Sequence, residues 1–141
     1  MFKVNISDKS GKTYKLEIEG NSLIDKELHD KIQGTDVSPD LDGYELEITG
    51  ASDKSGFTAI KEVSGVGIKK VLLGYGKGMH KKPKGDKKKN TSAGGLRLRK
   101  TVRGKTISEN ISQINMKVVK AGNKKLEEIF ATEKPAEEKS E

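Results

Sequence analysis

The sequence contains no cysteine and no tryptophan, and it is poor in proline and in aromatic residues. Without cysteine the chain can form neither a disulfide nor a thiolate metal site, which fits a reducing compartment. Apolar residues make up 31% and aromatic residues 4% of the 141 positions, so only a small core can be buried. No apolar run approaches the roughly eighteen residues of a membrane-spanning helix, and the N-terminus has no apolar signal region. We therefore expect a soluble, cytoplasmic protein of one domain.

What the sequence does have is basic charge, and that charge is concentrated in residues 69–105. This segment holds fourteen Lys and Arg against one acid, Asp86, and carries +13. Residues 1–68 carry −5 and residues 106–141 carry −1, which leaves the chain at +7. The protein is thus mildly acidic apart from one strongly basic segment, a distribution typical of a protein that binds a polyanion.

Alternation of apolar and polar residues predicts a mainly β protein. Residues 2–7 and 13–19 alternate around a polar turn at 8–11, which predicts a β-hairpin. Residues 44–48 alternate again and predict a third strand, followed by a polar turn over 50–56. Further strands are expected over residues 57–63, 68–73, 96–99 and 111–118. Within 68–73, the apolar run at residues 71–73 is expected to be buried, and the last strand is expected to bulge near Ser112.

Two short helices are also expected. Ser22 and Asp25 form the Ser-x-x-acid pattern of a helix start, Ile24, Leu28 and Ile32 are spaced four apart, and Gly34 is placed to end the helix. A second helix is expected over residues 123–131, capped by Asn123 and carrying Leu126, Ile129 and Phe130 on its apolar side.

These elements predict a single domain over residues 1–122, built as a small β-barrel or a strongly curved sheet. Residues 74–95 show no periodicity and contain six Gly and seven Lys, so we expect a long basic loop that orders on a partner. Residues 132–141 are rich in Glu, Lys and Ala and are expected to form a disordered tail.

No catalytic or metal-binding pattern is present. His29 and His80 are the only histidines, and neither has a neighbour that would make a metal pair or a catalytic dyad. The glycine-rich residues 74–78 lack the spacing of a phosphate-binding loop, and the acidic residues 40–42 lack the spacing of a calcium loop. We therefore expect no enzymatic activity, no metal and no cofactor.

The basic segment instead indicates binding to RNA. Arg97 and Arg99 alternate with leucines, which predicts a fixed positive face on a strand, and Arg offers paired N–H donors to phosphate oxygens. No helix-turn-helix, basic-helix or zinc pattern is present, so RNA is favoured over DNA. Tyr75 is the only aromatic residue in the segment, which favours shape and phosphate contacts over base stacking. The candidate RNA-binding residues are Lys69, Lys70, Lys81, Lys82, Lys84, Lys87, Lys88, Lys89, Arg97, Arg99, Lys100, Arg103 and Lys105.

Two blocks of sequence resemble a known family. Residues 50–57, Gly-Ala-Ser-Asp-Lys-Ser-Gly-Phe, and residues 99–104, Arg-Lys-Thr-Val-Arg-Gly, are similar to signature blocks of the six-e family of small-subunit ribosomal proteins, shared by archaea and eukaryotes. The resemblance covers roughly residues 1–122. Ala51 and the pair at 58–59 depart from the first signature, which usually has Gly-Gly and Pro-Met there. The long basic helix and tail of eukaryotic members are absent, which points to the short archaeal form.

The resemblance implies a β-barrel-like domain held on small-subunit ribosomal RNA, with a structural role in translation and no enzymatic activity. It implies a monomer within the ribosome, in contact with ribosomal RNA and neighbouring ribosomal proteins. It places Gly50, Asp53, Gly56 and Phe57 in the signature loop, and Arg99, Lys100, Arg103 and Gly104 in the basic block. The residues themselves leave two alternatives open, a non-ribosomal RNA-binding or RNA-chaperone module and a protein adaptor for an acidic partner.

Overall fold

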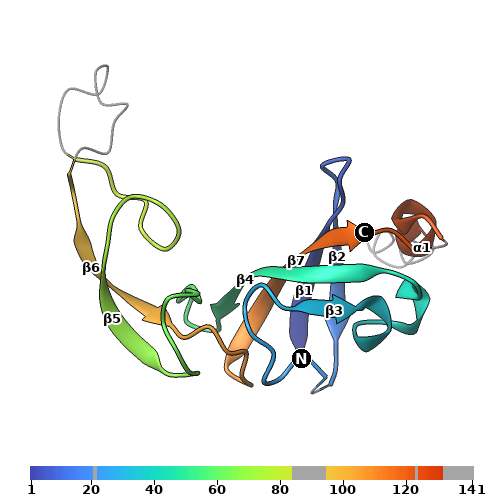
Figure 1. Ribbon diagram of the computed structural model, residues 1–141, viewed down its shortest axis with the longest axis horizontal. Helices are drawn as coiled ribbons and strands as arrows, with labels where there is room; N and C mark the ends of the chain where they lie inside the picture. The colour runs from blue at the N-terminus through green and yellow to red at the C-terminus, as the bar shows by residue number, and fades with distance from the viewer. Residues whose placement is uncertain (21, 84–94, 123, 132–141) are drawn as a thin grey trace, which may run out of the picture.

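The protein forms a five-stranded sheet from which a two-stranded ribbon projects (Figure 1). This computed structural model describes residues 1–20, 22–83, 95–122 and 124–131. The expected tail at 132–141 and the cap at Asn123 therefore lie outside the described residues. Within the described ranges no helix is long and apolar enough to cross a membrane.

The five-stranded sheet has the strand order β2-β1-β7-β4-β3. Its strands are β1 (Phe2–Ser7), β2 (Thr13–Ile18), β3 (Lys31–Gln33), β4 (Glu45–Asp53) and β7 (Ile111–Lys120). All neighbours are antiparallel except β1 and β7, which run parallel. The predicted N-terminal hairpin is confirmed, with Phe2 opposite Ile18. The prediction of a mainly β protein is confirmed. The described strands form an open sheet with β2 and β3 at its edges, and not the closed barrel that was one of the expected forms.

One face of this sheet carries the core. Val4, Ile6, Leu46, Ile48 and Ile114 are all fully buried, as the alternation in β1, β4 and β7 requires. The β7 bulge is also confirmed, because Ser52 pairs with residue 113 and Asp53 with residue 111, which leaves residue 112 unmatched.

The short helix α1 (Leu126–Ala131) packs against this core. Leu126 is buried, and the Phe130 ring stacks on Tyr14 of β2 with centroids 5.0 Å apart. The Tyr44 hydroxyl donates a hydrogen bond to the backbone carbonyl of Lys124, at the start of this segment. A helix predicted over residues 123–131 is therefore present over Leu126–Ala131, and residues 124 and 125 lie outside it.

The helix predicted over residues 22–34 is wrong. Residues 22–30 form turns, with left-handed φ angles of 66° at Asp25 and 74° at His29. Their backbone N–H groups bond to other segments, such as Asp25 to the Ile107 carbonyl at 3.1 Å and His29 to the Ile48 carbonyl at 2.8 Å.

Gly34 begins a 3-10 helix, η1 (Gly34–Asp36), instead of ending an α-helix, and η2 (Pro39–Leu41) follows. A Cβ on Gly34 would lie 2.0 Å from the Leu41 carbonyl oxygen, so the two 3-10 helices can pack together only around glycine.

The ribbon consists of β5 (Ile68–Leu73) and β6 (Leu98–Arg103), which are antiparallel. Ile60, Val63 and Val102 form a second small core at its base. The strand predicted over residues 57–63 is wrong, since that segment makes only isolated bridges from Thr58 and Ala59. The turn predicted over 50–56 begins later than expected, because β4 continues to Asp53. The burial predicted for residues 71–73 is wrong too, because Leu72 is 56% exposed.

Candidate nucleic-acid interface

Basic side chains project from both faces of the ribbon. In the β5–β6 register Leu72 lies opposite Arg99, and Lys69 lies opposite Val102. Residues directly opposite each other in an antiparallel pair share a face, and successive residues alternate. Arg99 and Lys70 therefore belong to one face, and Lys69 and Lys100 to the other. Arg97 is exposed just before β6 begins. The positive surface predicted on one side of a strand thus surrounds the ribbon.

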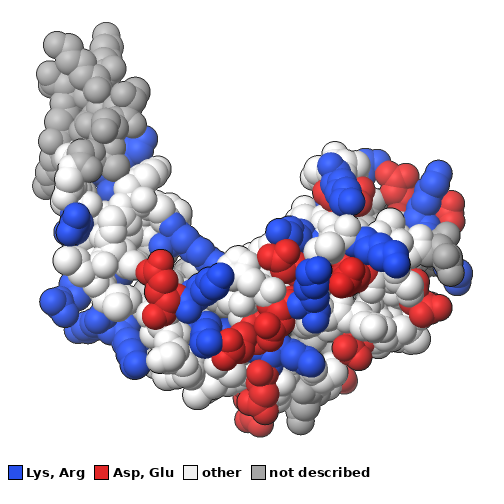
Figure 2. All heavy atoms as spheres, in the orientation of Figure 1, with Lys and Arg blue, Asp and Glu red and all other residues white. Residues whose placement is uncertain are grey.

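The described part of the ribbon and its loop, residues 68–83 and 95–103, contains nine Lys and Arg and no acidic residue. Figure 2 shows Lys and Arg side chains along the ribbon, whereas over the five-stranded sheet Lys and Arg are interspersed with Asp and Glu. On the sheet these charges form ion pairs, such as Lys3 with Glu17 at 3.5 Å and Lys117 with Glu47 at 2.9 Å. Neutralised charge on the sheet and unneutralised charge on the ribbon make the ribbon the electrostatic target for a polyanion.

Seven of the predicted RNA-binding residues lie exposed on the ribbon and its loop, and none of them forms an ion pair with an acidic residue that the structure describes. They are Lys69, Lys70, Lys81, Lys82, Arg97, Arg99 and Lys100. Four further candidates, Lys84, Lys87, Lys88 and Lys89, lie outside the described residues. The remaining two, Arg103 and Lys105, are paired with acids.

Arg103 lies in the interior, at the junction of the ribbon and the sheet. Its Nε donates to Asp53 Oδ2 at 2.6 Å, and its Nη1 donates to the Val66 carbonyl at 3.0 Å. The Arg103 and Asp53 side chains are only 10% and 5% exposed. The structure thus brings together the two family-like blocks, one residue from each, as a buried ion pair. Arg103 therefore stabilises the junction and is not available on the exposed surface of the ribbon.

The contact with Arg103 affects the pKa of Asp53. Burial raises the pKa of the carboxyl group, but hydrogen bonds from Arg103 and from the backbone of Ser55 and Lys54 outweigh burial. The net effect is a pKa below the ordinary value, so the buried carboxylate stays ionised.

The signature loop is a turn that closes on Asp53. The Asp53 backbone N–H donates to the Phe57 carbonyl, and the Gly56 N–H donates to the Asp53 carbonyl, both at 2.9 Å. Gly56 has φ +84°, which glycine adopts without strain. Phe57 is half-buried, and Gly50 lies within β4. Of the four predicted positions, Asp53, Gly56 and Phe57 form this turn, whereas Gly50 belongs to the strand before it.

Lys105 and its neighbour Gly104 are also engaged within the fold. Lys105 Nζ donates to Glu27 Oε2 at 2.5 Å. Gly104, next to it, approaches the backbone so closely that a Cβ there would lie 1.7 Å from the Gly65 carbonyl oxygen. The basic block therefore has two parts, an exposed part at Arg99 and Lys100 and a structural part from Arg103 to Lys105.

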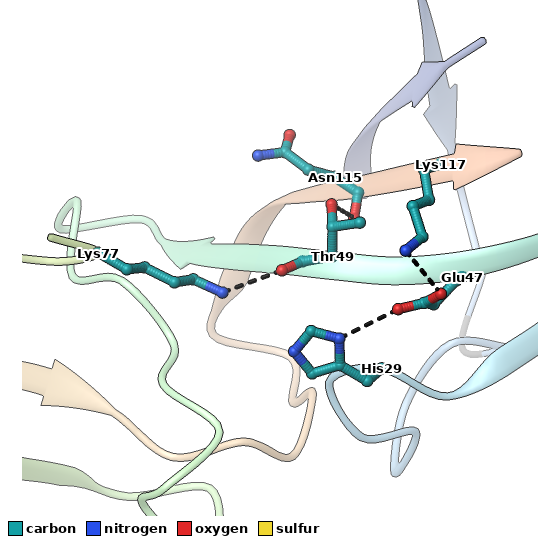
Figure 3. A network of polar contacts seen from close by, with 6 residues as sticks. All are labelled: His29, Glu47, Thr49, Lys77, Asn115 and Lys117. Atoms are coloured by element: carbon teal, nitrogen blue, oxygen red, sulfur yellow. Dashed lines mark hydrogen bonds and ion pairs between the residues drawn. The ribbon is translucent and has the colours of Figure 1, made fainter. Parts of the chain in front are cut away.

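Sequence reasoning missed Lys77, which ties the loop to the sheet. Residues 76 and 79 form a bridge, and the intervening turn places Met79 in the interior at 1% exposure. Lys77 Nζ donates to the Thr49 carbonyl of β4 at 2.9 Å, as Figure 3 shows, and Thr49 Oγ1 in turn donates to the Asn115 carbonyl. Burial lowers the pKa of Lys77. The glycines at 76 and 78 were the only signal that this part of the loop turns back.

His29 and Glu47 extend the polar face of the sheet (Figure 3). His29 Nδ1 lies 3.1 Å from Glu47 Oε1, and Lys117 donates to the other oxygen. Hydrogen bonds from Lys117 and His29 lower the pKa of Glu47. His29, expected to be solvated, is thus exposed but paired. Among the described residues no group of three or more His, Cys, Asp and Glu could hold a metal.

Comparison with known proteins gives consistent results. The pattern of the family described as Ribosomal protein S6e matches residues 2–131. The chain is 45% identical to the "Small ribosomal subunit protein eS6" of Methanococcus maripaludis over 123 residues, which cover 86% of this chain and 90% of that protein. It is 44% identical to the protein of the same name in Archaeoglobus fulgidus, over 92% of this chain and 95% of the relative. It is 41% identical to the protein of that name in Methanosphaera stadtmanae, over 100% of this chain and 99% of the relative.

Proposed function

Since the chain belongs to the ribosomal protein S6e family, we propose that it is a structural constituent of the small ribosomal subunit and binds ribosomal RNA through its basic ribbon. Membership of a family of ribosomal proteins supports a structural role in translation over an enzymatic one. The partners are small-subunit ribosomal RNA and neighbouring ribosomal proteins, which this chain meets as a monomer.

One observation carries the RNA-binding part of the proposal. Seven exposed Lys and Arg surround the ribbon and its loop, and no acidic residue occurs in the described part of these elements. Elsewhere in the described chain, lysines of the sheet pair with neighbouring carboxylates. Exposed cations that repel one another destabilise the free protein, and phosphate groups are the partners that relieve that repulsion.

The ribbon is well placed to reach RNA. It projects from the sheet (Figure 1), so RNA can contact the exposed basic side chains of the ribbon away from the mixed charges of the sheet. Arg99 offers a planar fork of donors to phosphate oxygens, whereas Lys70 and Lys100 act as point charges. Lys84, Lys87, Lys88 and Lys89 stay predictions from their charge alone.

The test reverses three ribbon charges and compares the result with three equal reversals elsewhere. The variant Arg97→Glu/Arg99→Glu/Lys100→Glu should lose co-sedimentation with small subunits in sucrose gradients. In vitro, its binding to a ribosomal RNA fragment should show a salt slope smaller by about two to three, since each lost phosphate contact removes roughly 0.7 to 0.9. Circular dichroism should remain that of the native fold, because all three residues are exposed.

The control variant carries Lys9→Glu, Lys15→Glu and Lys54→Glu, three exposed residues outside the ribbon. It has the same net charge as the ribbon variant, so it should keep most of the binding if the ribbon is the interface. Equal loss in both variants would show that net charge alone governs binding, and the proposed interface would be wrong.

The two alternatives give different results in the same assays. An RNA chaperone would bind many RNAs equally and would remain in the free protein fraction of the gradient. An adaptor for an acidic protein would retain its partner after the RNA has been digested with nuclease.

A further inference from the structure

Tyr75 is the one aromatic side chain that is open to solvent. It is 50% exposed, whereas Phe2 and Tyr44 are buried, and Tyr14 and Phe130 stack on each other. The structure describes all six aromatic residues of the chain, and Phe57, the sixth, is half-buried. Tyr75 lies two residues after the end of β5, within the basic segment. A large apolar ring is thus exposed among cations, which is where RNA is proposed to bind.

The backbone that carries Tyr75 is held from both sides. Before it, Leu73 packs on the small core at the base of the ribbon. After it, Gly76 and Met79 exchange backbone hydrogen bonds at 2.8 and 3.1 Å, and Met79 is buried. Lys77 then ties this turn to β4 through its bond to Thr49 (Figure 3). The backbone at Tyr75 is therefore held in place, and a ligand that stacks on the ring need not order this part of the loop first.

Two other side chains of the loop lie against the Tyr75 ring. The Lys82 ammonium is 5.7 Å from the ring centroid, and the His80 ring meets it edge-on, with centroids 6.2 Å apart and an angle of 85° between the planes. Both side chains are exposed. An exposed cation–π contact is weak, so Lys82 can exchange the ring for a stronger partner such as a phosphate oxygen.

We infer that Tyr75 is a stacking platform for an unpaired base of RNA, with Lys82 binding the phosphate of the same nucleotide. The inference rests on the proposed RNA-binding function and adds to it a preference for unpaired nucleotides. A paired base within a helix has no free face to offer, whereas a bulged base has one. Every base has a π-face, so the site tolerates any base identity. Tyr75, the only aromatic residue of the basic segment, therefore binds one base, whereas the surrounding Lys and Arg side chains bind phosphates.

The experiment compares two RNA hairpins that differ only by one unpaired adenosine in the stem. The full-length protein should bind the bulged hairpin more tightly than the paired one. Tyr75→Leu should weaken binding to the bulged hairpin by about 5- to 150-fold, the range found when a stacking aromatic is replaced. It should leave binding to the paired hairpin unchanged, and Tyr75→Phe should behave as the unaltered protein does.

Salt dependence separates stacking from charge. Because Tyr75 carries no charge, Tyr75→Leu should leave the slope of log affinity against log salt concentration unchanged, whereas Lys82→Gln should reduce it by roughly 0.7 to 0.9. Leu72→Ala is the matched control, because Leu72 is an apolar residue of the same ribbon and is 56% exposed. It should bind both hairpins as before.

Three results would overturn the inference: equal binding of both hairpins by the unaltered protein, no change for Tyr75→Leu, or an equal loss on both hairpins. Each of these leaves the proposed function standing if binding still depends steeply on salt and on Arg97 and Arg99. Failure of the proposed function would look different, since neither hairpin would then bind with a salt-dependent affinity.

Discussion

Removal of the Arg103 guanidinium should destabilise the protein more than any other substitution of a basic residue. Arg103→Met deletes a 2.6 Å charged hydrogen bond to Asp53 and a 3.0 Å bond to the Val66 carbonyl. It also leaves the Asp53 carboxylate, only 5% exposed, without a counter-charge. Breaking a buried pair in this way costs about 3 to 5 kcal/mol, a large part of the 5 to 15 kcal/mol typical of a small domain.

The magnitude can be measured by a double-mutant cycle. Urea unfolding followed by circular dichroism, on Arg103→Met, Asp53→Asn and the double variant, gives the coupling free energy. We expect about 2 kcal/mol or more, because the double variant leaves no unpaired charge inside. Arg103→Lys keeps the charge but cannot make both bonds, so it should be intermediate and remain folded if Arg103→Met does not.

The matched control is the exposed pair of Lys31 and Glu45, whose atoms lie 3.8 Å apart. Lys31→Met should change the free energy of unfolding by less than about 1 kcal/mol. A coupling free energy between Asp53 and Arg103 as small as that of this exposed pair would refute the reasoning, because it would show that the junction is open to water.

Further predictions concern the backbone, the pH dependence and the loop. Gly104→Ala should lower the midpoint of thermal unfolding sharply, since its Cβ would lie 1.7 Å from a carbonyl oxygen, whereas Gly74→Ala, with no atom within 4 Å, should have little effect. The depressed pKa of Asp53 contributes stability that is complete above the unfolded pKa of about 3.9 and is lost as pH falls through the lower folded value. In that acid range the urea midpoint of Asp53→Asn should therefore vary less with pH than the urea midpoint of the unaltered protein. Lys77→Met should speed amide hydrogen exchange in the turn that follows Tyr75 without changing the exchange of the sheet.

The strands of the sheet could be predicted because their information is local. Alternation in residues 2–7, 13–19 and 44–48 needs only a two-residue period and one buried face. Their partners could not be predicted, since nothing in β1 indicates that its second neighbour is the parallel strand β7, more than one hundred residues later. The helix prediction for residues 22–34 was wrong for the same reason. Their hydrogen bonds go to residues 48, 105 and 107, which no local pattern reveals.

The candidate site, too, could be predicted only where the information is local. The charge of the basic segment could be read directly, and the exposed positions of Arg97 and Arg99 fit the expected alternation, whereas Lys100 is exposed on the opposite face. Charge alone does not distinguish the exposed Arg99 from the buried Arg103, because both are arginines on the same face of the same strand. What separates them is Asp53, which comes from a distant segment and neutralises only one of them.

The place of β7 in the sheet has a consequence for the order of folding. β7 lies between β1 and β4, yet it is the last strand to be synthesised. Before residue 120 has been made, the β1–β2 hairpin and the β3–β4 pair share no hydrogen-bonded neighbour, and an isolated two-stranded hairpin is marginal in water. We therefore expect the nascent chain to stay largely unfolded until its basic ribbon sequence has already emerged. Folding should then be slow and all-or-none, as non-local strand pairing requires.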